Sequence, residues 1–447
     1  MQIDELSDRT GESVDRLREW SSLGLIGAGT AGAFSAEDVE RVRLVQFSIR
    51  RGFTAEAVAE ADRKFGGLLD NHLETLFPRG VGRRLRLPEA AASAGLTVEQ
   101  ARRLAEVSGT TEDLLEEDIE MLKRAKRAYN VGFPEEALLE LLRVHFDSLG
   151  RVAEADVRLF HFYVHERLRA AGVAGPELVD ATRTASAQLR PMIEPLLVYA
   201  HRKGMAKALR EDMLMHLAEA AGAPPAGPTP AQLRLAIAFT DLSSFTPMTQ
   251  SMGDAAAAQV IERFSELVRD AVARWEGRVV ERIGDAFMTV FSESRSAVGC
   301  ALDIEMLSAA EPQFPAVRSG VHWGAVLYRE GGYVGSSVNI AARLATEATR
   351  HQTLVTAAVL QEANGLEGVD FIPLGRRRLK GLADELELFE ARLRRAEPAA
   401  KAIDPVCGME VSLEAVAARL SLEGKDRAFC SEQCLRIFVA TPEKYAQ

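Results

Sequence analysis

Apolar residues recur at a helical spacing over most of residues 1–221, whereas short apolar runs beside turn residues begin at Leu235. The first pattern predicts helices and the second predicts strands. We expect short helices in the first stretch and long amphipathic helices later, in Ile3–Gly11, Glu12–Ile26, Phe34–Ala61, Val152–Ala171, Pro176–Tyr199 and Met205–Gly222.

The helical half contains an internal repeat. Gly95–Leu104 repeats the pattern of Gly11–Trp20, and Glu116–Leu138 repeats that of Ala36–Val58. Such self-similarity indicates one structural unit that is used twice. A second helix-turn-helix-like unit is therefore expected at about 86–144.

Two aspartates follow predicted strands. The apolar run Leu235–Phe239 ends at Asp241, as a buried strand does when it carries a carboxylate to its exposed end. The hairpin Arg278–Phe291 places Asp285 at its turn, after a glycine. A single aspartate in such a place is usually a turn or cap residue. Two of them at neighbouring strand tips can hold two divalent cations, which activate a hydroxyl and neutralise a leaving oxygen.

Further polar groups accompany these aspartates. The LSSFT segment after Asp241, which includes Phe245 and Thr246, leads into a helix, and free N–H groups there suit an anionic phosphate. Asn339 and Arg343 are four residues apart and therefore share a helix face. An amide and a guanidinium so placed can orient a ribose and stabilise charge on a phosphoryl group.

In order along the chain, FTDLSSFT, ERIGDAFM, GVHWGAV and GSSVNIAARL resemble the catalytic domain of class III nucleotidyl cyclases, over roughly Leu233–Leu393. The resemblance implies two Mg²⁺ or Mn²⁺ ions per active site. It also implies a pair that stabilises the transition state and a lysine that reaches the triphosphate. The matching positions are Asp241 and Asp285 for the metals, with the carbonyl of Leu242, Asn339 and Arg343 for the pair, and Lys380 for the lysine.

The same resemblance implies a fold, an assembly and a reaction. A twisted, ferredoxin-like sheet with helices would pair head to tail with a second copy. Each active site of this homodimer would combine the aspartates of one subunit with Asn339 and Arg343 of the other. The ribose 3′-hydroxyl would attack the α-phosphate and release pyrophosphate and a 3′,5′-cyclic nucleotide.

The base-selecting positions depart from the family pattern. Glu281 stands where adenylyl cyclases usually carry lysine and guanylyl cyclases carry glutamate, and Gly332 occupies the second selector position. A glutamate can accept hydrogen bonds from guanine but cannot donate one to adenine N1. Because bacterial members are mostly adenylyl cyclases, ATP is our first choice, with GTP or relaxed specificity as the alternative.

Length, charge and hydropathy limit the number of domains, the possible partners and the expected location of the protein. The 447 residues suggest about three domains, and the net charge of −11 argues against general nucleic-acid binding. No apolar run approaches the ~18–20 residues needed to cross a bilayer, and no signal peptide is recognised. We therefore expect a cytoplasmic protein without a membrane segment.

The first 61 residues resemble the MerR-type helix-turn-helix. The wing expected at Gly27–Ala33 has no basic residue, and phosphate contacts supply most non-specific DNA affinity. A retained regulatory fold is thus favoured over DNA binding. An alternative of a different class is a transcription regulator that uses the cyclase fold as a nucleotide sensor.

Residues 62–221 resemble the helical regulatory domain that precedes some actinobacterial-type class III cyclases, which implies a role in dimerisation. A Pro- and Gly-rich linker, 222–232, follows. Five of the eight histidines lie between His145 and His216, and His161 and His165 share a helix face. They are either scattered surface residues or parts of a pH-responsive dimer.

Residues 403–447 resemble the YHS domain in the motifs DPVCGM and FCSEQC. Cys430 and Cys434 are four apart and fall on one helix face, and Cys407 can join them as a thiolate ligand. Cu(I), Zn(II) or Fe are conceivable there, with a thiol or structural role as the alternative. The expected fold class is α+β: an all-helical N-terminal half, the cyclase sheet with its helices, and a small C-terminal module.

Overall fold

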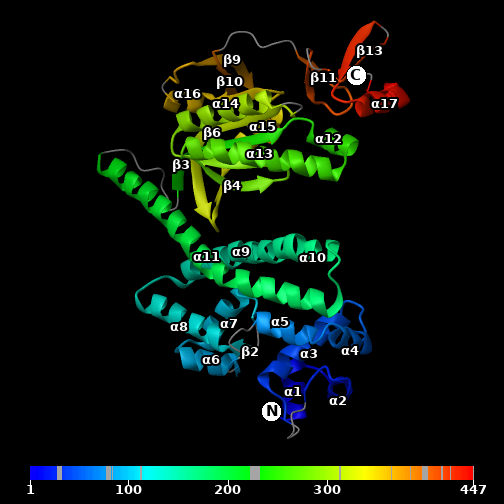
Figure 1. Cartoon of the computed structure of the whole chain (residues 1–447). Coiled ribbons are helices and arrows are strands. Elements are labelled where there is room, and N and C mark those ends of the chain that lie inside the picture. The colour runs from blue at the N-terminus through cyan, green and yellow to red at the C-terminus, as the bar shows by residue number, and fades with distance from the viewer. Residues whose placement is uncertain are drawn as a thin grey trace. The chain divides into compact units, whose positions relative to one another are not determined.

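The computed structural model describes residues 1–27, 33–76, 82, 84–110, 113–221, 232–311, 314–363, 365–382, 384–394, 401–413, 416–422 and 424–445. The chain divides into two compact units, Met1–Ala220 and Ala221–Gln447, which are described separately (Figure 1). None of the helices in the described ranges is long and apolar enough to cross a membrane.

The first unit begins with five short helices packed around Leu17, Trp20 and Val42. Ser13 and Ser35 accept hydrogen bonds from backbone N–H groups at the starts of α2 and α3, because helix N-termini leave such donors unpaired. The helices are α1 Ile3–Thr10, α2 Val14–Ser22, α3 Ala36–Ile49, α4 Ala55–Lys64 and α5 Leu68–Leu76. Most of the expected wing, 28–32, lies outside the described residues.

The internal repeat is visible in the structure. α6 (Leu87–Ala94), α7 (Val98–Val107) and α8 (Glu116–Asn130) follow in the same order as α1, α2 and α3, around a second apolar core. Gly95 ends α6 with a left-handed conformation, as Gly11 ends α1. In the second copy of the repeat, β1 (Arg84–Arg86) pairs with β2 (Asp113–Leu115).

Long helices complete the first unit. α9 (Glu135–Phe160) continues through a π-helical turn, η1 (His161–His165), into α10 (Glu166–Ala170). The break expected between Tyr199 and Met205 is wrong, because α11 (Gly175–Ala220) is continuous. A glycine such as Gly204 costs only about 1 kcal/mol inside a helix and need not end it.

The histidines of this region lie on these long helices. The rings of His161 and His165 stack 5.1 Å apart, and Glu166 Oε1 lies 3.5 Å from His161 Nε2. His145 and His201, from α9 and α11, have ring centres 6.2 Å apart. The hypothesis of a pH-responsive dimer stays a prediction.

The second unit is built on a mixed sheet with the strand order β4-β5-β3-β6-β8-β10-β9, and β7 pairs with β6 (Figure 1). β6 and β8 are parallel and the other neighbours are antiparallel. The strands are β3 Gln232–Leu242, β4 Arg278–Ile283, β5 Ala286–Phe291, β6 Val317–Arg329, β7 Gly332–Val334, β8 Gln352–Thr356, β9 Val369–Arg377 and β10 Leu386–Leu393. β3 starts within the expected linker, of which 222–231 lie outside the described residues.

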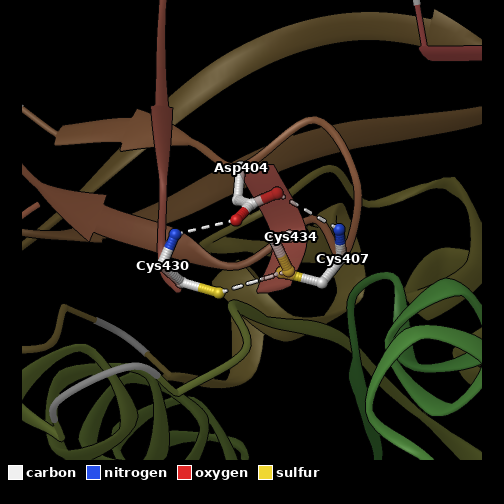
Figure 2. A group of neighbouring side chains, drawn as sticks. All are labelled: Asp404, Cys407, Cys430 and Cys434. Carbon is white, nitrogen blue, oxygen red and sulfur yellow. Dashed lines mark hydrogen bonds between the residues drawn. The ribbon is translucent and has the colours of Figure 1, made fainter. Parts of the chain in front are cut away.

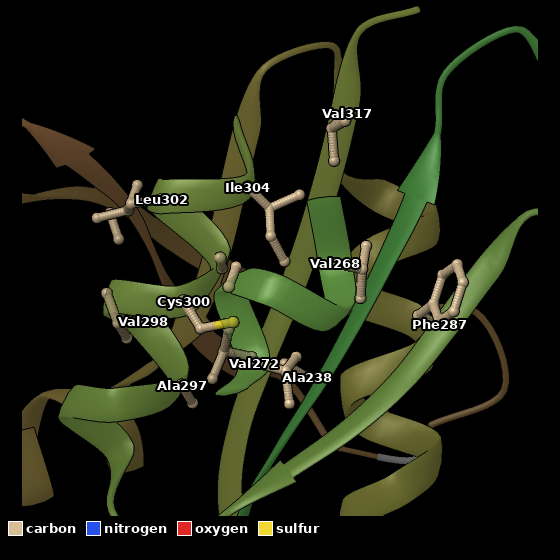
Figure 3. Packing of buried hydrophobic residues seen from close by; sticks show 14 of the residues in the cluster. Ala238, Val268, Val272, Phe287, Ala297, Val298, Cys300, Leu302, Ile304 and Val317 are labelled. Carbon is tan, nitrogen blue, oxygen red and sulfur yellow. The ribbon is translucent and has the colours of Figure 1, made fainter. Parts of the chain in front are cut away.

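Alternation along β3 separates two layers of the core. Ala236, Ala238 and Leu242 face a cluster formed with α13 and α14, part of which Figure 3 shows. Ile237 and Phe239 face the opposite cluster, to which α15 contributes. The helices of this domain are α12 Phe245–Met252, α13 Asp254–Arg274, α14 Ser294–Ala310, α15 Ser336–Glu347 and α16 Ala357–Ala363.

A buried histidine in this sheet predicts a pH-dependent stability. His322 on β6 is 9% exposed, its Nδ1 lies 2.8 Å from Thr356 Oγ1, and burial lowers its pKa to about 4. Between pH 6.5 and 4 the unfolded chain therefore binds a proton that the folded chain excludes. We expect stability to fall by up to about 3 kcal/mol over that range.

Thermal unfolding followed by tryptophan fluorescence at pH 7.5, 6 and 5 would measure this effect. The variant His322→Asn keeps a hydrogen-bonding group near Thr356 but cannot titrate in this range. Its melting temperature should therefore depend less on pH than that of the wild type, even if the smaller side chain lowers both values. An equal pH dependence in both proteins would contradict the assignment.

The C-terminal module contains two small antiparallel pairs, a helix and a 3₁₀ turn. Its core joins Phe429 and Phe438 with the module's cysteines, and it includes Met248 and Ala257 of the cyclase-like domain. The elements are β11 Lys401–Ile403, β12 Glu410–Ser412, β13 Ala418–Leu422, β14 Lys425–Phe429, α17 Glu432–Ala440 and η2 Pro442–Tyr445.

Candidate active site

The structure brings Asp241 and Asp285 together, and we refer to them as the aspartate pair. Asp241 lies at the end of β3, Asp285 lies in the turn between β4 and β5, and the register pairs Thr240 with Phe287. Burial first, and then the adjacent carboxylate of Asp241, raise the pKa of Asp285 to about 6. Two carboxylates so close in a half-buried site favour a bound cation.

An arginine that the sequence analysis missed occupies this site. Arg318 Nε and Nη2 donate to Asp241 Oδ2 at 3.0 and 2.5 Å, and Nη1 donates to Thr346 O at 3.3 Å. β3 and β6 are antiparallel, and their register places Arg318 directly opposite Asp241. The GVHWGAV motif in the sequence indicated a strand just after Arg318. Only the register of that strand, β6, against β3 shows that Arg318 lies opposite Asp241. The guanidinium therefore forms an ion pair with Asp241, one member of the aspartate pair.

The segment Leu242–Phe245 connects the aspartate strand to α12. Ser243 N donates to Ala316 O at 2.7 Å, and Ser244 adopts a left-handed backbone with φ of 64°. Such a conformation is uncommon for a serine and needs support from its neighbours. The side chain of Leu242 is buried, Phe245 is half-buried and Thr246 is exposed in the first turn of α12.

Asn339 and Arg343 share one exposed face of α15. The opposite face carries Ala341, Leu344 and Ala345, which pack against the sheet. At 100° per residue, both polar side chains point away from that buried face. Among the described residues, no hydrogen bond or ion pair joins them to the aspartate pair. The structure therefore places Asn339 and Arg343 on one face of α15, without a contact to the aspartate pair among the described residues.

A second cluster lies in the C-terminal module (Figure 2). Cys407 Sγ is 3.5 Å from Cys430 Sγ, which is 3.7 Å from Cys434 Sγ, and all three are buried free thiols. We call these three residues the thiol cluster. Hydrogen bonds from Cys407 and Cys430 lower the pKa of Cys434, so one thiolate is favoured there. Thiolates on one Zn²⁺ at ~2.3 Å are spaced ~3.8 Å apart, close to these distances.

The expected placement of Cys430 on the same helix as Cys434 is wrong. α17 begins at Glu432, because Ser431 caps it by accepting a hydrogen bond from Cys434 N at 3.2 Å. Cys430 therefore belongs to the end of the β14 segment. The cysteines still meet because the chain turns between them.

Asp404 was also missed as a functional residue, although it stands in the DPVCGM motif. Its Oδ1 accepts from Val406 N at 2.8 Å and Cys407 N at 3.4 Å, and its Oδ2 accepts from Cys430 N at 2.8 Å (Figure 2). The carboxylate is fully buried. It clamps the two cysteine-bearing segments to one another, and with the thiols it forms a group of four potential metal ligands.

The comparisons with known proteins identify the family of this chain. The model of the adenylate and guanylate cyclase catalytic domain matches residues 230–390. The Mycobacterium tuberculosis protein Rv2212 is 30% identical over 339 residues, covering 71% of this chain and 82% of that protein. The chain belongs to the class III nucleotidyl cyclases.

Two further relatives of this cyclase are named as adenylate cyclases. The adenylate cyclase of Glutamicibacter nicotianae is 29% identical and covers 63% of this chain and 72% of that protein. The pH-sensitive adenylate cyclase MT1302 of Mycobacterium tuberculosis is 26% identical and covers 83% of this chain and 90% of that protein. The models of the MerR HTH family regulatory protein and the YHS domain match residues 1–64 and 402–447. These matches support the expected modules.

The remaining predicted substrate residues of the cyclase lie on its surface. Glu281 is exposed on β4, the edge strand, and Gly332 begins β7. The guanidinium of Arg278 on β4 lies 5.3 Å from the ring centre of Tyr333, next to Gly332, so side chains from β4 and β7 meet. Lys380 is exposed in the turn after β9 and makes no ion pair with the described residues.

Proposed function

We propose that the enzyme is a homodimer that converts ATP to 3′,5′-cyclic AMP and pyrophosphate at sites shared between its two subunits. The observation that carries this proposal is the outward orientation of Asn339 and Arg343. The inner face of α15 is buried against its own sheet, so its polar face is available to a second copy. The aspartate pair of that copy would then complete the site.

The aspartate pair and the carbonyl of Leu242 would hold two Mg²⁺ or Mn²⁺ ions. Oxygen donors with two carboxylates suit these hard cations. When bound, such ions activate the ribose 3′-hydroxyl and neutralise the leaving pyrophosphate. Asn339 would orient the ribose, and Arg343 would stabilise charge on the α-phosphoryl group. Lys380 and the N–H groups before Phe245 and Thr246 would bind the triphosphate.

The first unit supports dimer formation. Met192 and Leu196 on α11 each expose 64% of their surface, and Leu209 and Leu214 further along expose 60% and 61%. Large apolar side chains gathered on one helix usually mark a contact surface. Because α11 is the last described helix before the cyclase domain in the chain, a second copy packed on it would place two cyclase domains in one assembly.

Cyclic nucleotide formation from ATP and GTP, measured side by side with Mn²⁺ and Mg²⁺, tests this function. We expect cyclic AMP as the main product, in keeping with the names of two relatives. Efficient GTP turnover with little ATP turnover would overturn the choice of base. If neither cyclic AMP nor cyclic GMP is formed, the proposed enzyme activity is contradicted.

Base selection should depend on Glu281. A lysine there can donate a hydrogen bond to adenine N1, which a carboxylate cannot do. Glu281→Lys is therefore expected to raise the ratio of ATP to GTP turnover, as kcat/KM, by about tenfold, or 1.4 kcal/mol. The matched control Glu281→Gln can also donate but carries no charge, and it should have a smaller effect. An unchanged ratio in both variants would remove Glu281 from the base pocket.

Other expectations stay predictions. DNA binding by the helix-turn-helix and regulation by pH are not tested by the geometry of the site. A cytoplasmic location is likewise expected from the sequence alone. A gel shift at physiological salt would test the first of these, because phosphate contacts weaken steeply with salt.

A further inference from the structure

The C-terminal module is joined to the cyclase domain through a common core. Met248 of α12 and Ala257 of α13 are 1% and 3% exposed, and they belong to the apolar cluster that contains Cys407, Phe429 and Phe438. Phe245, the first residue of α12, packs against this cluster and also against the main core of the cyclase domain. The thiol cluster and the helix that follows the aspartate strand therefore belong to one apolar core.

A polar contact crosses the same boundary, and we call it the arginine bridge. Arg350, just before β8, donates through Nη1 to Gly408 O and through Nη2 to Ser244 Oγ at 2.6 Å. Gly408 directly follows Cys407, and Ser244 is three residues after Asp241. One side chain thus links the thiol cluster to the segment that is expected to bind the triphosphate.

The neighbouring residue makes a second connection. His351 Nε2 lies 2.7 Å from Glu410 Oε1 of the module, and His351 N donates to Val317 O at 2.8 Å. Val317 precedes Arg318, which holds Asp241. Both contacts of the module therefore lie next to residues that position Asp241 or the segment after it.

The turn that carries Cys407 is stiff enough to transmit a displacement. Asp404 accepts N–H groups of Val406, Cys407 and Cys430, and two backbone hydrogen bonds close the loop, from Asp404 N to Met409 O and from Gly408 N to Asp404 O. A change in the sulfur positions must move Gly408, because the loop has little freedom to absorb it.

Gly408 packs against Arg350 and Ser244 without free space between them. A Cβ on Gly408 would lie 2.8 Å from both Arg350 Nη2 and Ser244 Cβ. Ser244 itself is held at φ of 64°, which needs support from its surroundings. The contact is thus a tight fit between a thiol-bearing turn and a strained residue of the catalytic segment.

We propose that a thiophilic d¹⁰ ion, Zn²⁺ or Cu⁺, bound by the thiol cluster regulates the cyclase through the arginine bridge. The inference rests on the proposed function, because it names the regulation of that site. Ion binding releases the thiol protons to solvent and draws the three sulfurs to common distances. The Cys407 turn and the bridge are then held in one arrangement, which orders Leu242–Phe245 for the triphosphate. Arg350 acts as a positioning residue, through its contacts with Gly408 and Ser244.

Amide hydrogen exchange on the full chain tests the proposal without turnover. The protein is loaded with one equivalent of Zn²⁺ or, under anaerobic conditions, Cu⁺. Comparison of the two loaded samples identifies the ion that produces the effect. In the wild type, loading should slow exchange at 243–249 by about fivefold or more, a typical size for coupling between sites. The KM for ATP should fall by a similar factor.

Two glycine variants separate the bridge from general damage to the module. Gly408→Ala should abolish the effect of the ion on exchange while the ion still binds at one per chain. The control Gly424→Ala introduces a Cβ at a similar φ, 76° against 74°, but in open space, and it should respond like the wild type. Arg350→Met, which removes the bridge without adding bulk to the turn, should also lose the response if Gly408→Ala does not fold.

Several outcomes would overturn the inference. One is binding of neither ion, or binding that survives Cys434→Ser. Another is binding that leaves exchange at 243–249 unchanged, which would make the ion purely structural. A wild type that forms cyclic nucleotide but shows no response refutes the coupling alone. A response in exchange without any product refutes the proposed function but leaves the coupling standing.

Discussion

Replacing Asp285 with asparagine is expected to lower cyclic nucleotide formation by at least about a thousandfold, or 4 kcal/mol. The amide keeps the shape of the side chain but removes the charge that a divalent cation needs. The remaining carboxylate, Asp241, already shares its charge with Arg318. One aspartate is therefore insufficient to hold two ions.

The same substitution should not destabilise the fold. Burial and Asp241 raise the pKa of Asp285 to about 6, so at pH 7.5 the folded chain carries a carboxylate whose charge is disfavoured there. A group with a raised pKa stabilises the folded state most at low pH, and this contribution is lost as the pH rises through 6. Without metal at pH 7.5, Asp285→Asn should thus melt at the same temperature as the wild type or higher.

Activity and melting temperature measured together check this expectation. The control Asp270→Asn removes a carboxylate from the exposed surface of α13 and should retain full activity. Retention of more than about a tenth of the activity by Asp285→Asn would remove it from the metal site, since loss of a metal ligand costs several kcal/mol. A large drop in melting temperature would instead assign the residue a structural role.

Two inactive variants should form an active heterodimer. Asp285→Asn and Arg343→Ala damage different halves of a shared site, so a mixed dimer contains one site with both defects and one with neither. Co-expression with two different tags and tandem purification isolates this heterodimer. Its activity should be about half that of the wild type, because one of two equivalent sites is intact.

A second heterodimer provides the matched control. Asp241→Asn with Asp285→Asn damages the same half of each site, and this pair should stay inactive. Inactivity of both heterodimers would contradict a site shared between subunits and would require Arg343 to act on the aspartates of its own chain. Activity in both would contradict the assignment of the aspartate pair to a single subunit.

Much of the active site was predictable because its residues are specified by short-range pattern. An apolar run followed by Asp241, and a glycine before Asp285, mark a strand end and a tight turn without any knowledge of the sheet. The four-residue spacing of Asn339 and Arg343 places them on one helix face in the same way. The three cysteines of the C-terminal module were also found by their motifs, although the helix containing Cys434 begins later than expected.

The sequence pattern predicted helix boundaries less well where neighbouring residues favour different local structures. Two helices were expected, ending at Tyr199 and beginning at Met205, but α11 continues through the stretch between them. Cys430 and Cys434 were expected on one helix face, but in the structure capping by Ser431 separates Cys430 from α17. In both cases the outcome depends on free-energy differences of about 1 kcal/mol, which a spacing rule does not resolve.

Periodicity, turn residues and the family resemblance carried by the ordered motifs were sufficient to predict the α+β class, the aspartate pair and the thiol cluster. Contacts between distant segments were needed for the rest. Arg318 reaches Asp241 only through the register of β3 and β6, and Arg350 meets Gly408 only because the C-terminal module shares a core with α12. The periodicity of a sequence predicts on which face of its own helix or strand a residue lies. It does not record which distant element packs there, because that is decided by the burial of many side chains at once.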